Sequence, residues 1–163
     1  MNQRNLLRLS AISAVGLALS AGNAAAQSAK DLVGSWAPFS VDAYGPNPKG
    51  SLIFEANGRY SLQLMRPNLP KYQSNNRTQG TPGEYKFTVE GSLAHFGTYS
   101  VSGNDLIFHV EASTFPNWSG TEQKRINLSI TEDVLRYTNP VPSGGYVNLV
   151  PASAAFVEWR RVK

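Results

Sequence analysis

The stretch SLIFEANGRYSLQLM, residues 51–65, decides the fold class of this chain. Apolar and polar residues alternate on both sides of Asn57-Gly58. The residues that share the apolar face are Leu52, Phe54, Tyr60, Leu62 and Leu64. A period of two is typical of a half-buried strand, and Asn-Gly between two such runs favours a two-residue hairpin turn whose central residues need positive φ. The stretch therefore predicts an antiparallel hairpin with one buried face.

Short strands and tight turns continue through the rest of the chain. An initial strand is expected within residues 32–44, with a kink or bulge at Pro38, because proline cannot donate to a strand ladder. Further turns are predicted at 102–105 and 131–133, and residues 156–162 form the last expected strand. Roughly eight short strands at this spacing predict a β-sandwich or an antiparallel barrel.

Residues 81–96 fit both a helix and a strand. Thr81, followed by Pro82 and by Glu84 three positions on, has the composition of a capping box at a helix N-terminus. The residues that would share one helical face are Tyr85, Val89, Leu93 and Phe96. The residues that alternate as in a strand are Tyr85, Phe87 and Val89. We favour a short helix of about ten residues, with a strand over 82–92 as the alternative.

The first 26 residues have the layout of a secretory signal peptide. Two arginines and an apolar run precede three alanines at 24–26. The apolar run is too short to span a membrane, and no later run is long and apolar enough to do so. We expect cleavage after about Ala26. A mature single domain over residues 27–163 would then be secreted or periplasmic.

Composition argues against several classes of function. Removing the first 26 residues takes two arginines from the 15 basic residues, which leaves 13 against 11 acidic ones, a net charge of +2. Such a small charge gives no electrostatic motive for binding nucleic acid. The chain has no cysteine, which excludes thiol catalysis and cysteine-based zinc sites. Its two histidines do not have metal-ligand spacing, so neither a metal nor a cofactor is expected.

Several blocks of the chain are similar to those of one known family. Gly34-Ser35-Trp36 matches its Gly-X-Trp motif in the first strand. The other matching blocks are residues 44–67, 95–101 and 109–125 and the Trp-X-Arg ending within EWRRV, 158–162. On these blocks, which span about 30–163, the chain resembles the bacterial lipocalin-like domain family of calycin-type β-barrels.

The resemblance implies a mainly β fold, an antiparallel lipocalin-like barrel of about eight strands with one short helix. In such barrels the tryptophan of the first strand plugs the closed end, and an arginine of the last strand packs over its indole. Trp36 would take the first role, next to Gly34, which permits close approach of the backbone. Arg161 would take the second role rather than Arg160, because Arg161 shares a strand face with Trp159.

A closed barrel of about eight strands can hold one small ligand, so interior side chains are the candidate contacts. The candidate ligand-binding residues are Tyr60, Gln63, Arg66, Tyr99, His109, Trp118 and Arg125, with Gln123 as a further polar candidate. His109 would either pair with Glu111 or face the cavity, and Arg125 would either pair with Glu111 or bind a ligand carboxylate. His95 is expected at a helix end or turn.

The sequence predicts an exported protein that binds a small, mainly apolar molecule inside its barrel. One alternative is a barrel enzyme of the cyclase or isomerase type, with His109 or Tyr99 as acid or base, although no catalytic motif assigns such a residue. Another is a barrel filled by its own side chains, with a structural or partner-binding role. The loop at 66–80 is polar and contains prolines, and the sequence leaves open whether it acts as a lid.

Overall fold

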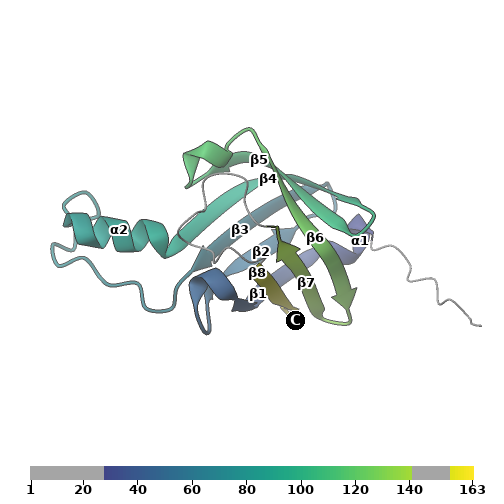
Figure 1. The fold of residues 1–163 in the computed structure, drawn as a ribbon, viewed down its shortest axis with the longest axis horizontal. Coiled ribbons are helices and arrows are strands. Elements are labelled where there is room, and N and C mark those ends of the chain that lie inside the picture. The colour runs from purple at the N-terminus through teal and green to yellow at the C-terminus, as the bar shows by residue number, and fades with distance from the viewer. Residues whose placement is uncertain (1–27, 141–154) are drawn as a thin grey trace, which may run out of the picture.

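The computed structural model describes residues 28–140 and 155–163. The predicted signal peptide, 1–26, and most of the loop expected after the seventh strand lie outside the described residues. Eight strands close into one barrel in which each strand pairs antiparallel with its neighbours in sequence and the last pairs with the first (Figure 1). The strands are β1 (Gly34–Val41), β2 (Lys49–Phe54), β3 (Arg59–Met65), β4 (Ser92–Ser102), β5 (Asp105–Ser113), β6 (Glu122–Thr131), β7 (Val134–Asn139) and β8 (Ala155–Arg161).

The predicted barrel is thus confirmed, and the two-sheet sandwich that strand spacing alone allowed is wrong. The predicted kink in β1 is also confirmed, since its pairing with β8 shifts register between Pro38 and Ser40. Three short helical turns were not predicted: α1 (Ala29–Leu32), η1 (Asp42–Tyr44) and η2 (Pro116–Trp118).

The hairpin at Asn57-Gly58 exists, but its turn differs from the expected one. Glu55 N donates to Arg59 O at 2.8 Å, and Gly58 N donates to Glu55 O at 3.0 Å. Gly58 has φ of +87°, whereas Asn57 does not have positive φ. The loop is therefore a turn followed by one left-handed residue. The Asn57 side chain explains the difference, because it donates to the Glu55 carboxylate and accepts from Arg59 N.

One end of the barrel is closed by Trp36 and Arg161. The Trp36 indole is fully buried and donates from Nε1 to Leu32 O at 2.8 Å. The Arg161 guanidinium lies 4.1 Å from the centre of that ring and donates to Val33 O and to the backbone of α1. A Cβ on Gly34 would meet the same guanidinium at 2.9 Å, so a glycine here leaves room for it. We call this end, next to α1, the closed end.

The predicted helix is confirmed as α2 (Pro82–Glu90), with the capping box in place between Thr81 and Glu84. The helix stops before Gly91, so Leu93 and Phe96 lie in β4 and not on a helical face as expected.

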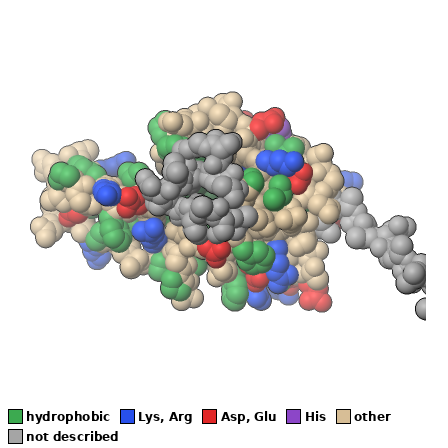
Figure 2. Space-filling view, viewed as in Figure 1, with side chains coloured by type: hydrophobic (Ala, Val, Ile, Leu, Met, Phe, Trp, Pro, Cys, Tyr) green, Lys and Arg blue, Asp and Glu red, His purple; other side chains and the backbone are tan. Residues whose placement is uncertain are grey.

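Residues 66–91, here called the arm, extend away from the barrel (Figure 1). The irregular part of the arm packs along α2: Gln73 N donates to the Glu84 carboxylate, and the rings of Tyr72 and Tyr85 lie 5.7 Å apart. No residue of α2 is buried. Hydrophobic side chains of the arm consequently reach its surface among lysines and arginines (Figure 2).

Candidate functional site

A cluster of aromatic and polar side chains lies inside the barrel, which we call the inner cluster. Its members are Tyr60, His95, Phe108, Trp118 and Arg125. They come from β3, β4, β5, η2 and β6. Alternation along the strands turns Tyr60, His95, Phe108 and Arg125 inward, and the helical turn η2 brings Trp118 to them. All five are buried, although two of them carry ionisable nitrogens.

Ring contacts hold the inner cluster together. The Phe108 ring lies 4.4 Å from Tyr60 and 5.6 Å from His95, between ring centres. The indole of Trp118 meets His95 edge-on, with 5.6 Å between ring centres. The guanidinium carbon of Arg125 lies 5.5 Å from the Phe108 centre and 5.6 Å from the Trp118 centre. An arginine placed against aromatic rings at this range is stabilised by cation–π attraction.

His95 is the least expected member of the inner cluster. Its side chain is 2% exposed, and its Nδ1 lies 2.7 Å from the Tyr60 hydroxyl oxygen. Its Nε2 is buried and has no hydrogen-bond partner in the part of the chain that the structure describes. Burial, and secondly the positive charge of Arg125, lower the pKa of His95 to about 3. The imidazole is therefore neutral at ordinary pH, with one ring nitrogen left unused.

Arg125 gives the interior a positive potential. Its guanidinium donates to Lys124 O at 2.9 Å, and its side chain is buried. Burial raises the pKa of Tyr60 and of Tyr137, and the charge of Arg125 opposes that rise in both. Both phenols thus stay protonated at ordinary pH and can donate hydrogen bonds.

A second buried polar atom without a partner lies on β7. The Oδ1 atom of Asn139 makes no hydrogen bond to any described residue. Two residues earlier, the Tyr137 hydroxyl accepts from Trp159 Nε1 at 3.0 Å. Native proteins leave few buried polar atoms unpaired, so each such atom is a candidate contact for a bound molecule.

The structure brings three of the sequence candidates into the inner cluster: Tyr60, Trp118 and Arg125. Arg66 lies just beyond the end of β3, where its backbone N–H donates to Gly91 O. Gln123 is the cross-strand partner of Phe108, and its side chain donates to the Thr121 hydroxyl.

The structure places the other candidates away from the cluster. Gln63 is exposed on the outer face, because the flanking leucines of β3 point inward. His109 also faces outward, where Nδ1 lies 3.0 Å from the Glu122 carboxylate and Nε2 lies 3.0 Å from the Ser100 hydroxyl. Alternation in the sequence already contained this signal, since both residues flank predicted core positions.

Tyr99 is buried at the closed end, and not in the inner cluster. Its hydroxyl donates to Glu55 O at 3.1 Å and also lies 3.3 Å from Ala29 O. It therefore fastens α1 and the β2–β3 turn to the barrel. His109 and Tyr99, the two acid–base candidates, thus do not converge on one site.

The expected pairings of Glu111 were wrong. Glu111 accepts two hydrogen bonds from Arg59, at 3.0 and 2.8 Å, on the barrel surface. It pairs neither with His109, whose partner is Glu122, nor with the inward-facing Arg125. The helix expected within residues 81–96 also placed His95 at a helix end or turn, whereas β4 begins at Ser92 and carries it inward. The alternation of His95 with Tyr99, four residues on, could have shown this.

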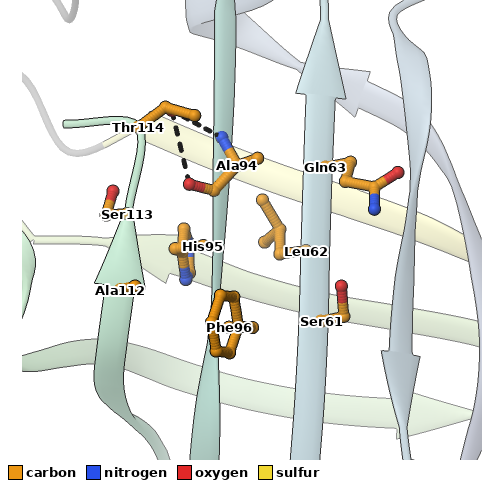
Figure 3. A pocket seen from close by; sticks show the side chains of 9 residues that line it. All are labelled: Ser61, Leu62, Gln63, Ala94, His95, Phe96, Ala112, Ser113 and Thr114. Atoms are coloured by element: carbon orange, nitrogen blue, oxygen red, sulfur yellow. Dashed lines mark hydrogen bonds between the residues drawn. The ribbon is translucent and has the colours of Figure 1, made fainter.

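A hollow of about 260 Å³ lies along the barrel wall between β3, β4 and the end of β5, and His95 is among its lining residues (Figure 3). The Thr114 hydroxyl there accepts a hydrogen bond from Ala94 N and donates one to Ala94 O. Its lining includes His95 of the inner cluster together with exposed Gln63 and Phe96, and contains no Lys, Arg, Asp or Glu side chain.

The hollow and the inner cluster therefore share His95. The inner cluster is the stronger candidate because it adds the buried Arg125 and the rings of Tyr60, Phe108 and Trp118 to this histidine.

The described residues, 28–140 and 155–163, contain no group of three or more His, Asp or Glu side chains placed to hold a metal ion. None of their helices has the length and apolar character needed to cross a membrane.

Comparison with known proteins finds a matching family model and a similar protein. The sequence model of a protein family described as a lipocalin-like domain matches residues 38–162. The 4'-hydroxy-3'-methoxypropiophenone carrier protein of Aspergillus oryzae is 30% identical over 112 residues, which cover 63% of this chain and 96% of that protein.

Proposed function

Because this chain belongs to the lipocalin-like domain family, we propose that it is a carrier that binds one small, mainly apolar molecule inside its barrel, against the inner cluster. The observation that carries this proposal is the unpaired Nε2 of His95, buried among aromatic rings. Leaving a buried polar atom unpaired costs about 1–3 kcal/mol. A ligand that pairs with this atom would recover that free energy.

The relative supports an aromatic ligand. The name of that Aspergillus oryzae protein states that it carries 4'-hydroxy-3'-methoxypropiophenone, which is an aryl ketone. The rings of Phe108 and Trp118 would form apolar walls for a ligand of that class. A one-ring ligand that buries roughly 200 Å² of apolar surface gains about 5 kcal/mol. Micromolar affinity needs about 8 kcal/mol, so the polar atoms of the cluster would have to supply part of the difference.

Calorimetric titration with 4'-hydroxy-3'-methoxypropiophenone and a panel of one-ring aromatic ketones tests this proposal. We expect one equivalent to bind, and Trp118→Ala to weaken binding at least tenfold because it removes one apolar wall. Thr98→Ala is the control, since Thr98 is exposed on the outer face of β4 and belongs neither to the inner cluster nor to the lining of the hollow. Absence of binding across the panel, together with no co-purified molecule in native mass spectra, would instead favour the filled barrel with a structural role.

The alternative of a barrel enzyme loses the two acid–base candidates that the sequence offered for it. It required His109 or Tyr99 beside a bound substrate, but the structure places the first outside the barrel and the hydroxyl of the second against backbone carbonyls at the closed end. We therefore assign no catalytic step.

We also propose that residues 1–26 direct export and are then removed. The basic start, apolar run and small residues before Gln27 support this. Every described element begins at Ala29 or later, so cleavage after Ala26 would leave all of them in place. Intact-mass analysis of the protein from the periplasm or medium is the test, and a cytosolic chain that retains residue 1 would contradict the proposal.

A further inference from the structure

We propose that Tyr60 holds His95 in the tautomer that carries its proton on Nε2, so that the barrel selects ligands with a hydrogen-bond acceptor oxygen, such as an aryl ketone. This inference rests on the proposed function only for the place of the ligand. The tautomer itself is a property of the empty protein. Neither the barrel fold nor the aryl ketone in the relative's name requires a hydrogen bond between Tyr60 and His95.

The hydrogen bond between Tyr60 and His95 can be satisfied in two ways. If the hydroxyl donates to Nδ1, the imidazole proton lies on Nε2. If Nδ1–H donates to the hydroxyl oxygen, the hydroxyl proton must find another acceptor. Among the described residues the Tyr60 hydroxyl has no second hydrogen bond, and both side chains are buried. The first arrangement leaves one group unpaired, the Nε2–H, whereas the second leaves two, the hydroxyl proton and the lone pair of Nε2. Each unpaired buried polar group costs about 1–3 kcal/mol, so the first arrangement is favoured.

A charged imidazole, which would be a donor at both nitrogens, is excluded separately. Burial lowers the pKa of His95, and Arg125 acts in the same direction. Tyr60 also cannot accept from Nδ1 as an anion, since burial raises the pKa of its phenol. The neutral pair with the proton on Nε2 is therefore the favoured state of the empty site.

The surroundings of Nε2 then favour acceptors over donors. The rings of Phe108 and Trp118 stand 5.6 Å from His95, and neither ring carries a lone pair in its plane that could accept from a ligand. Arg125, which lies against both rings, has donors only. A ligand oxygen would accept from Nε2–H, whereas a ligand that can only donate would force His95 into the tautomer that leaves the Tyr60 proton unpaired.

Long-range proton–nitrogen NMR of the ¹⁵N-histidine-labelled protein without ligand tests the tautomer directly. We expect the pattern of a neutral ring protonated on Nε2 for His95 in the wild type. Protonation on Nδ1, or an imidazolium at pH 7, would overturn the inference whether or not any ligand binds.

Three bicyclic probes of similar size test the selectivity: 1-indanone, which only accepts, indole, which donates from its N–H, and indane, which does neither. In wild type we expect 1-indanone to bind at least tenfold more tightly than indole. In Tyr60→Phe the ratio of the two affinities should fall towards one. Without the hydroxyl, Nδ1 has no partner in either tautomer, so His95 can accept from indole as readily as it donates to 1-indanone.

Tyr99→Phe is the matched control, since it removes a hydroxyl that lies at the closed end. It should keep the wild-type ratio, and indane binding by each variant reports whether the pocket is intact. If the wild type binds indole as tightly as 1-indanone, or if the ratio is unchanged in Tyr60→Phe, the inference is overturned. The proposed carrier function is not affected by either result. Failure of all three probes to bind would count against the carrier function, and the NMR result would still decide the tautomer.

Discussion

A histidine buried beside an arginine makes the stability of this barrel depend on pH. Burial and Arg125 together lower the pKa of His95 to about 3, against about 6.5 in an unfolded chain. Between these values the unfolded chain binds a proton at this position and the folded chain does not, so stability falls as pH falls below about 6.5. The largest slope that one such group can give is about 1.4 kcal/mol per pH unit.

We predict that His95→Asn removes this component. Between pH 6.5 and pH 5 the wild type should lose roughly 2 kcal/mol more of its free energy of unfolding than the variant does. Urea denaturation at the two pH values measures both losses, and subtraction cancels the titration of the carboxylates that the two proteins share. Equal losses would mean that His95 takes up its proton freely in the folded barrel.

Single residues were predictable where one strand face decided their position. Alternation selected Arg161 over Arg160 for the indole of Trp36, and the guanidinium of Arg161 does lie over that ring. The same rule places Gln63 and His109 on the outer face, because each lies between two inward-facing residues, and their polar side chains alone do not make them ligand contacts. The pairing of Tyr60 with His95 joins residues 35 apart in sequence, and only the register between β3 and β4 brings them together.

At the scale of elements, α2 forms where its capping residues predict a helix, although none of its residues is buried against the barrel. Its capping box was readable from Thr81 and Glu84, and both hydrogen bonds are present. Its predicted apolar face was not real, because Gly91 ends the helix and the later residues join β4. Over so short a stretch, the same residues can fit both the period of a helix and the start of a strand. Only the pairing of β4 with β3 shows that residues from Ser92 on form a strand.

We predict that Thr81→Ala loosens α2 without weakening the barrel. Loss of an N-cap side chain costs about 1 kcal/mol, which corresponds to roughly fivefold faster opening of the helix. Since no residue of α2 is buried, the melting temperature of the barrel should change little. Hydrogen exchange of the amides in Pro82–Glu90 measures the first effect and calorimetry measures the second.

Thr98→Ala is a suitable control for that experiment, because Thr98 is an exposed residue of β4 and caps no helix. It should leave exchange in α2 unchanged. A fall in melting temperature on Thr81→Ala comparable with that of a core substitution would show that α2 contributes to the barrel core after all.

At the scale of the whole molecule, the chain has no disulfide, and closure of the sheet depends on the seam between β1 and β8. The barrel could be predicted because short strands recur along the chain and the family blocks span nearly all of it. The register of the seam could not be predicted from local patterns, since it joins residues about 120 positions apart, such as Trp36 and Arg161. Arg161 fixes the seam from the last strand, donating to Val33 O and Asp31 O while it covers the indole.

We predict that Arg161→Met opens this seam. It removes two hydrogen bonds to backbone carbonyls and the cation–π contact, so the free energy of unfolding should fall by about 2–3 kcal/mol. Urea denaturation measures that loss, and amides of β1 and β8 should exchange faster than those of β4 and β5. Arg160→Met is the matched control, because Arg160 lies on the outer face, where Glu158 keeps its second partner, Arg136; it should cost less than about 1 kcal/mol. If both variants lose the same stability, the closed end does not depend on which arginine covers Trp36.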